Sequence, residues 1–218
     1  LFKKMVLGML LKNNKYIKKN KYILFLIIIF NVPSSFAFDY FSYMDNLNSF
    51  STFFKQNTYN DNGLLIKSSE GYLLYKKQSK YILEYKYPNI VKFVSDGNFI
   101  TTYDEDLEQA IIQSTNNKEK NNIVDIMTNK KLIKKNFTLN TNTIDGEKHI
   151  KFKPINNEIR NNVFLLVIKK NKIERITFMN DFDQSVTMIF KDFEKNIEVL
   201  DSSFKIDIPE NFDVIIDK

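Results

Sequence analysis

Apolar and polar residues alternate along most of this chain after about residue 50, which is the pattern of half-buried β-strands. In residues 81–87, Tyr81, Leu83, Tyr85 and Tyr87 share one face, and the residues between them, mostly charged, share the other. Alternation and composition predict strands over residues 50–59, 64–68, 71–76, 81–87, 90–94, 99–103, 107–113, 137–140, 149–153, 163–169, 173–179, 186–193 and 204–208, with the second and third forming one long strand interrupted near Ser68-Ser69-Glu70.

Two segments have the spacing of amphipathic helices instead. Tyr40, Met44 and Leu47 are spaced i, i+4 and i+7, and Asp39 is available as an N-cap, so residues 39–49 are predicted to contain a short helix. A second helical pattern runs over residues 119–135 and predicts either one helix or two short ones. Its apolar positions are Ile123, Ile126, Met127 and Ile133.

Turn residues separate the predicted strands. Ser95-Asp96-Gly97-Asn98 supplies residues that tolerate a positive φ, and a second, acidic turn follows at Asp104-Glu105-Asp106. Asn171 and Asp183 are also expected at tight turns, where Asn and Asp adopt a positive φ more readily than other residues. Consecutive strands joined in this way form antiparallel hairpins.

Roughly ten strands with only four glycines after residue 37 predict a single antiparallel sheet, either a barrel or a strongly curved half-barrel. The two helical segments could then close the mouth of this sheet and leave a lined cavity beneath them. Periodicity alone leaves open whether Tyr81, Leu83 and Tyr85 line such a cavity or belong to a packed core.

Residues 1–37 have the organisation of a secretory signal peptide. Seven lysines and no acid precede an apolar run at residues 22–30, and Ser35-Phe36-Ala37 places small residues at both positions that determine cleavage. The apolar run is shorter than the about 20 residues that a membrane span needs. We therefore expect cleavage before Phe38, the alternative being an uncleaved anchor helix. Met5 and Met9 are candidate start residues.

Removal of this leader changes the charge of the protein. The whole chain has a formal net charge of +6, but residues 38–218 carry 25 basic and 26 acidic residues, a net charge near −1. No positive field remains that would favour nucleic acid as a partner. The chain contains no cysteine, so it cannot carry the acyl groups of a lipoprotein itself, and a core without disulfides must stabilise it.

Catalytic and metal-binding patterns are absent from the sequence. His149 is the only histidine, and we expect it to be a surface residue of a strand. Without cysteine there is no metal-ligand cluster and no His-based catalytic triad. The acidic run at residues 104–108 lacks the ligand spacing of a calcium loop and predicts a solvated turn. We therefore predict no enzymatic activity, no cofactor and no metal.

Four segments resemble the LolA family of periplasmic lipoprotein carriers. The strongest resemblance is in residues 94–109, where VSDG is followed by a short strand and then by YDEDLEQ. The other segments are Leu47-x-x-Phe50-x-x-x-Phe54-x-Gln56, Gly71-Tyr72-Leu73 and residues 81–88, with weaker support from residues 181–187 and 204–215. The chain departs from the family motif by having Thr101 and Glu105 in place of Trp and Pro.

The resemblance implies an incomplete antiparallel β-barrel with a helical lid over a hydrophobic cavity, formed by residues 38–218 as one carrier domain. It favours the cavity interpretation of the aromatic strand face. Residues implied to line the lipid-binding cavity are Phe53, Tyr75, Tyr81, Leu83, Tyr85 and Phe93. The underside of the lid would be Ile123, Ile126 and Met127. The arginine that tethers the lid in the family falls at Lys77, where lysine keeps the charge but loses the planar fork of donors.

By the same resemblance, the protein would be a soluble, monomeric periplasmic carrier that shields the acyl chains of lipoproteins. The donor would be the inner-membrane ABC transporter that releases lipoproteins, and the acceptor an outer-membrane lipoprotein receptor, LolB, where the organism has one. The alternative is a half-barrel module of the same fold that binds another lipid or senses envelope lipoproteins.

Overall fold

Twelve strands form one sheet in the computed structural model, which describes residues 38–115, 123–155 and 163–217. The expected leader, residues 1–37, lies outside the described residues. The strands are β1 (Ser49–Tyr59), β2 (Leu65–Lys76), β3 (Lys80–Tyr87), β4 (Val91–Asp96), β5 (Phe99–Asp104), β6 (Gln109–Ser114), β7 (Phe137–Ile144), β8 (Glu147–Pro154), β9 (Phe164–Lys169), β10 (Lys172–Met179), β11 (Ser185–Lys195) and β12 (Asp213–Asp217).

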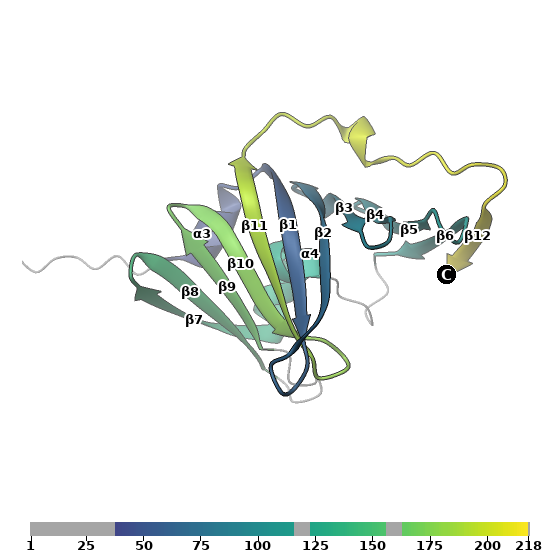
Figure 1. Cartoon of the computed structure of the whole chain (residues 1–218). Helices are drawn as coiled ribbons and strands as arrows, with labels where there is room; N and C mark the ends of the chain where they lie inside the picture. Colours follow the sequence, from purple (N-terminus) through teal and green to yellow (C-terminus); the bar gives the residue numbers. More distant parts are fainter. Residues whose placement is uncertain (1–37, 116–122, 156–162, 218) are drawn as a thin grey trace, which may run out of the picture. The chain divides into compact units, whose positions relative to one another are not determined.

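The sheet is curved and does not close. Its strand order is β12-β6-β5-β4-β3-β2-β1-β11-β10-β9-β8-β7, so β12 and β7 are its two edges (Figure 1). Neighbouring strands are antiparallel except for β12, which pairs in parallel with β6. The predicted fold, a mainly β half-open barrel with helices, is therefore confirmed.

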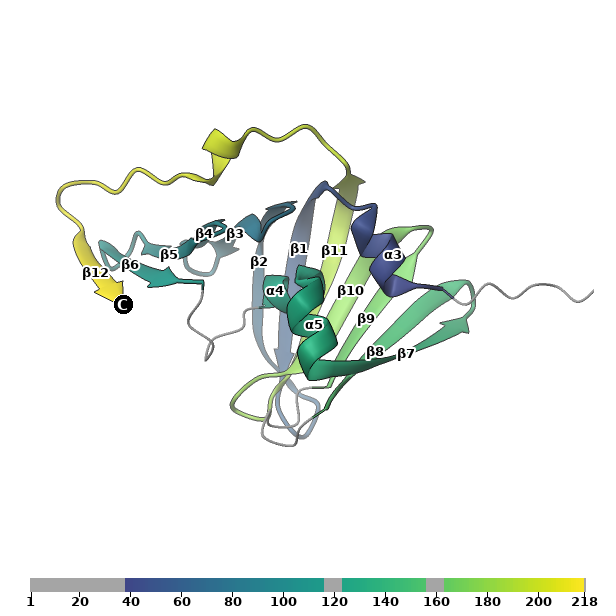
Figure 2. The ribbon, with the colours of Figure 1, turned by 180° about the vertical axis from the view of Figure 1, so that it is seen from behind.

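Three short helices lie on the concave side of the sheet: α3 (Tyr40–Asp45), α4 (Ile123–Thr128) and α5 (Lys130–Asn136) (Figure 2). The predicted N-cap of the first is confirmed, because Phe41 N donates to the Asp39 carboxylate at 2.9 Å. The second pattern forms two helices because the extended backbone of Asn129 separates them and its side chain caps α5. None of the helices in the described part is long and apolar enough to cross a membrane.

The hydrophobic core lies between these helices and the concave face of the sheet. Phe50 of β1 stacks on Tyr75 of β2 with 5.0 Å between the ring centroids, and Tyr40 of α3 packs edge-on against Phe152 of β8 at 5.2 Å. Met127 and Ile133 bring α4 and α5 into the same cluster. The amphipathic pattern of the helical segments thus faces the apolar side of the strands.

Two of the strand predictions were wrong in detail. β2 runs without interruption through Ser68-Ser69-Glu70, because each of these residues pairs with a residue of β1. Residues 204–208 form no strand: a 3₁₀ turn, η1 (Asp201–Phe204), is followed by extended chain, and the last strand is β12. Phe204 is buried and Ile206 and Ile208 are half-buried, so their alternation reflects a segment packed on one side rather than a strand in a ladder.

The segment between β11 and β12 crosses β2 and β3 on its way to the far edge of the sheet. Asp201 of η1 receives the ammonium groups of Lys76 at 2.6 Å and of Lys80 at 2.7 Å. Lys76 also donates to the carbonyl of Val199 at 2.8 Å. Further along, the ring of Phe212 stacks on Tyr103 of β5 at 4.7 Å. These contacts hold the crossing segment and so position β12 beside β6.

Candidate functional site

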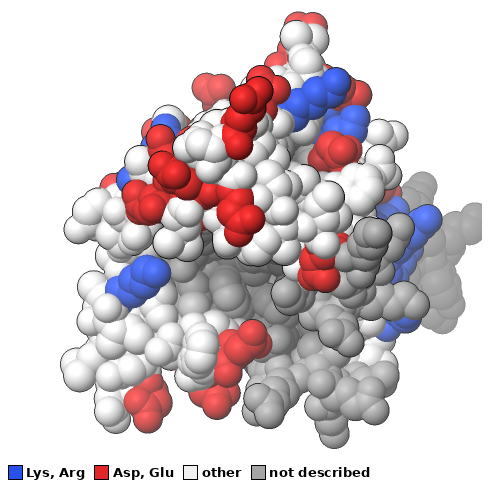
Figure 3. Space-filling view, turned by 90° about the vertical axis from the view of Figure 1, so that its right-hand side faces the viewer, with Lys and Arg blue, Asp and Glu red and all other residues white. Residues whose placement is uncertain are grey.

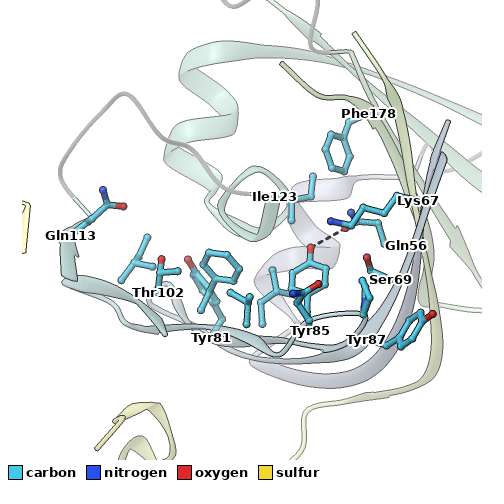
Figure 4. Close-up of a pocket in the computed structure, with 16 residues that line it drawn as sticks. Gln56, Lys67, Ser69, Tyr81, Tyr85, Tyr87, Thr102, Gln113, Ile123 and Phe178 are labelled. Carbon is cyan, nitrogen blue, oxygen red and sulfur yellow. Dashed lines mark hydrogen bonds between the residues drawn. The ribbon is translucent and has the colours of Figure 1, made fainter. Parts of the chain in front are cut away.

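A cavity of about 570 Å³ lies between the concave face of the sheet and α4. Figure 4 shows Tyr81, Tyr85 and Thr102 rising from the sheet toward the side where Ile123 lies. The lining residues come from seven strands, the turn after β3 and one helix: Gln56, Lys67, Ser69, Tyr81, Leu83, Tyr85, Tyr87, Pro88, Asn89, Val91, Phe93, Ile100, Thr102, Gln113, Ile123 and Phe178. This volume falls within the about 300–1,000 Å³ of typical ligand pockets.

Strand register explains why these residues meet. Leu83 of β3 is opposite Phe93 of β4, and Phe93 is opposite Thr102 of β5. Directly opposed residues in a sheet project to the same face, so one row of side chains crosses three strands along the cavity wall. Ile100 and Gln113, opposed on β5 and β6, extend the same wall.

The cavity wall is mostly aromatic and aliphatic, with polar side chains at both ends: Thr102 and Gln113 at one, and a polar group near Tyr85 at the other. Gln56, Lys67 and Ser69 gather near Tyr85 in Figure 4, and the hydroxyl of Tyr85 donates to Gln56 Oε1 at 2.8 Å. Burial raises the pKa of Tyr85 to about 12, so this hydroxyl stays protonated and remains a donor at neutral pH. The wall therefore combines aromatic surface with a small number of fixed polar groups.

Of the residues that the sequence pointed to, Tyr81, Leu83, Tyr85, Phe93 and Ile123 line the cavity. Tyr87, at the end of the same strand face, lines it as well. The alternating face of β3 that carries these residues therefore lies on the concave side, where burial of one face accounts for the strand period of two.

Phe53 was assigned to the wrong face of β1. Its side chain is 51% exposed and packs on Tyr72 of β2, with 5.4 Å between the ring centroids. Phe54, the next residue, is buried and packs against Tyr85. Phe50, Phe54 and Gln56 have the same parity along the strand, so Phe53 must project to the opposite, outer face.

Tyr75, Ile126 and Met127 lie in the hydrophobic core rather than at the cavity surface. Tyr75 is 4% exposed, and Met127 is 1% exposed. Tyr75 and Met127 lie between the sheet and the helices, as expected. At this position the space is filled by core side chains, so neither residue reaches the cavity. Only Ile123, at the start of α4, reaches the cavity.

Lys77 makes its hydrogen bonds beside α3 rather than to α4 or α5. Its Nζ donates to the carbonyl of Asp45 at 2.6 Å and to Asn48 Oδ1 at 2.7 Å. The carboxylate of Asp45 in turn receives Lys130, the first residue of α5, at 2.5 Å. Lys77 is therefore connected to α5 through Asp45, without contacting α5 itself.

A hydrogen bond also joins α3 to α4, and the sequence did not indicate it. The buried hydroxyl of Tyr40, in α3, donates to the carbonyl of Met127, in α4. Burial raises the pKa of Tyr40, so the hydroxyl keeps its proton. The helical spacing identified Tyr40 only as a core residue, because a hydrogen bond between helices 87 residues apart in sequence leaves no periodic pattern.

Several cavity residues were also missed. Ile100 and Thr102 lie on β5, opposite residues of β4 and β6, and Phe178 lies on β10, which approaches the cavity from the other half of the sheet. Strand register across the hairpin at Gly97 could have identified the first two. Within the described residues no group of three or more His, Asp or Glu is arranged to hold a metal ion.

Comparisons with known proteins found a matching family, related sequences and a similar solved structure. A sequence model of the family described as outer membrane lipoprotein carrier protein LolA matches residues 45–207. An outer-membrane lipoprotein carrier protein from Francisella philomiragia is 26% identical over 211 residues, which cover 89% of this chain and 97% of that protein. Another from Nitrosomonas europaea is 26% identical over 171 residues, covering 78% and 83%. The crystal structure of a LolA superfamily protein from Nitrosomonas europaea aligns with a TM-score of 0.45 at 11% identity, covering 78% of this chain and 99% of that chain.

Proposed function

The chain belongs to the family of the outer membrane lipoprotein carrier protein LolA, and from this premise we propose that it carries acylated lipoproteins through the periplasm. The family model and the related proteins from Francisella philomiragia and Nitrosomonas europaea are all described as outer-membrane lipoprotein carrier proteins. The observation that supports a carrier role most directly is the cavity of about 570 Å³ with its aromatic and aliphatic wall. It offers an apolar ligand a place away from water.

In this proposal the acyl chains lie along Tyr81, Leu83, Phe93 and Ile100, beneath Ile123. Enclosing a CH₂ group stabilises the complex by about 0.8 kcal/mol, so one chain of about 15 such groups gains roughly 12 kcal/mol at full burial. Ester and amide carbonyls at the base of the acyl chains need hydrogen-bond donors. In this proposal Lys67, Gln56 and Ser69, which lie near Tyr85, supply them (Figure 4).

A carrier must also release its cargo, which requires that binding compete with another favourable state. Helices α4 and α5 would provide that state as a lid: when Met127 and Ile126 pack in the core, they occupy space next to the cavity. Cargo that displaces the lid loses part of its binding energy to breaking these contacts. The affinity then lies between that of the donor and that of the acceptor.

We propose the inner-membrane lipoprotein-releasing ABC transporter as the donor and an outer-membrane lipoprotein receptor, LolB where present, as the acceptor. Export through a cleaved leader, with Phe38 as the first residue of the mature chain, completes the proposal. The mature protein would act as a monomer, with no cofactor and no nucleic acid partner.

Mass spectrometry of the protein purified from periplasm tests this proposal. We expect an intact mass that corresponds to a chain starting at Phe38, together with a co-purified triacylated lipoprotein that is absent from the Leu83→Glu variant. Retention of residues 1–37 would contradict a free carrier. Co-purification of a free lipid without any lipoprotein would instead favour a lipid-binding module of the same fold.

A further inference from the structure

β12 is an exposed apolar edge of the sheet. Its Val214, Ile215 and Ile216 are 45%, 42% and 63% exposed. Edge strands of natural proteins are normally protected against pairing by charged side chains, above all lysine, by proline or by a bulge in the strand. β12 contains neither lysine nor proline, its pairing with β6 shows no register shift, and its only charged residues are Asp213 and Asp217 at its two ends. The opposite edge, β7, is rich in Thr and Asn instead.

The inner face of β12 continues the wall of the cavity. Ile215 is in register with Ile111 of β6, and Ile111 is opposite Thr102 of β5. Thr102 belongs to the row that includes Phe93 and Leu83. A single row of side chains therefore runs over five strands from the cavity to the edge of the sheet. A strand added to β12 would lengthen this row.

Two carboxylates mark the ends of the apolar edge. Asp213 and Asp217 lie two residues before and after Ile215, and so project from the same face. Glutamine amides approach both: Gln109 contacts Asp213 at 3.4 Å, and Gln113 donates to Asp217 at 2.7 Å. Among the described residues, no Lys or Arg forms an ion pair with either carboxylate, which leaves their charge available to a partner.

The surroundings of β12 are acidic as well. Figure 3, turned so that the side of β6 and β12 faces the viewer, shows acidic side chains gathered above a hollow and few basic ones. Exposed acids on the neighbouring turn and crossing segment are Glu105, Asp106, Glu108, Asp207 and Glu210. A partner that pairs with this edge must therefore tolerate, or prefer, a negative field.

A second copy of the chain does not fit these charges. Antiparallel pairing of two β12 strands centred on Ile215 would place Asp213 of each copy directly opposite Asp217 of the other. Like charges in directly opposed positions destabilise a strand pair. The same geometry favours a strand with basic residues at these two positions and apolar residues between them.

We propose that β12 is a docking edge for an extended protein segment, which adds to the sheet as a further strand. This segment has apolar residues in the middle and a basic residue at each end. Backbone hydrogen bonds to the free edge would supply affinity, the apolar residues would cover Val214, Ile215 and Ile216, and the basic residues would pair with Asp213 and Asp217. This proposal concerns a protein partner and does not depend on what the cavity binds.

NMR titration of the purified protein with two synthetic peptides tests the proposal. One peptide is Gly-Gly-Lys-Val-Ile-Val-Lys-Gly-Gly, and the other has Glu in place of both Lys. We expect the Lys peptide to bind about tenfold more tightly, because two cross-strand pairs change from attractive to repulsive in the Glu peptide. Amide shifts should be concentrated in β12 and β6.

The double variant D213K/D217K should reverse this preference, so that the Glu peptide binds more tightly. The matched control D61K/D181K makes the same change in net charge in the turns β1–β2 and β10–β11, and should leave the preference unchanged. Equal affinity of the two peptides, reversal in the control variant, or amide shifts confined to other strands would overturn the proposal. Dimerisation of the peptide-free protein through β12 would also overturn it, because the edge would then accept a second copy.

Discussion

Phe54 of β1 and Tyr85 of β3 pack edge to face across the strand that separates them, with 5.1 Å between their ring centroids. Gly71 of β2 is opposite both residues. A methyl group on Gly71 would lie 2.5 Å from the ring of Phe54 and 2.0 Å from the carbonyl oxygen of Glu84. The glycine thus leaves the space in which the two rings meet, and Tyr85 is held where it reaches Gln56 in the cavity.

Gly71→Ala should therefore destabilise the protein. Overpacking of this kind costs about 1–3 kcal/mol, because the rings or the backbone must move. Denaturant unfolding measures the loss of stability. The double variant Gly71→Ala, Phe54→Leu should recover part of it by removing the ring that the new methyl group meets. A Gly71→Ala protein as stable as the wild type would show that β1 and β3 can move away from the added methyl group without a loss of unfolding free energy.

Leu83→Glu should abolish binding of acylated cargo, since it places a carboxylate in the apolar wall of the cavity. Co-purification of lipoprotein measures binding, and circular dichroism monitors the fold. Phe53→Glu is the matched control: its side chain lies on the outer face, so binding should persist. Loss of the fold in Leu83→Glu would favour a packed core at this position, and loss of binding in Phe53→Glu would place cargo on the outer face.

Tyr40→Phe should loosen the lid. The variant leaves the buried carbonyl of Met127 without its donor, which costs about 1–3 kcal/mol and shifts the open population by roughly fivefold to a hundredfold. Hydrogen exchange of the α4 amides measures the opening. Tyr43→Phe is the control, because that hydroxyl makes only a 3.4 Å exposed contact with Asn171. Unchanged exchange in Tyr40→Phe would exclude this attachment as a restraint on the lid.

Lys77 and Lys130 should differ in their effect on hand-off of cargo. Lys130→Leu removes the ion pair between α5 and Asp45 directly, whereas Lys77→Leu removes contacts with Asp45 and Asn48 beside α3. Both sets of contacts are exposed to solvent, so neither substitution should change the stability of the protein much. A transfer assay should show the larger defect for Lys130→Leu. A larger defect for Lys77→Leu would indicate that Lys77, rather than Lys130, is the main residue holding α4 and α5 closed.

The crossing segment should detach in acid. Hydrogen bonds from Lys76 and then Lys80 lower the pKa of Asp201 to about 2, below its usual value of 3.8. A carboxyl whose pKa is lowered in the folded state stabilises the fold above its unfolded pKa, and this stabilisation is lost as the pH falls through the folded pKa. The melting temperature should therefore fall between about pH 4 and about pH 2 more in the wild type than in Asp201→Asn.

Asp207→Asn is the control for this experiment, because Asp207 is exposed in the same segment. It should follow the wild-type pH profile. If Asp201→Asn follows it too, the two lysines do not hold the crossing segment in solution.

Elements that depend on local pattern could be predicted from the sequence. Alternation located the aromatic face of β3, helical spacing and Asp39 located α3, and turn residues placed the hairpin at Gly97. These features need only the period of a strand or helix and the backbone preference of a few residues. For the same reason Tyr81, Leu83 and Tyr85 could be assigned together to one face.

Features that depend on residues distant in the chain could be identified only in the folded protein. Phe54 rather than Phe53 faces inward because that face of β1 packs against Tyr85 of β3. Lys77 bonds to Asp45 because α3 ends beside it. Residues 204–208 resembled a strand but are held on the sheet by other contacts, and β12 pairs with β6 about a hundred residues earlier. The pattern of apolar residues along the chain shows which side of a helix or strand is buried. Which element packs against that side depends on strand register and on the path of the chain between elements.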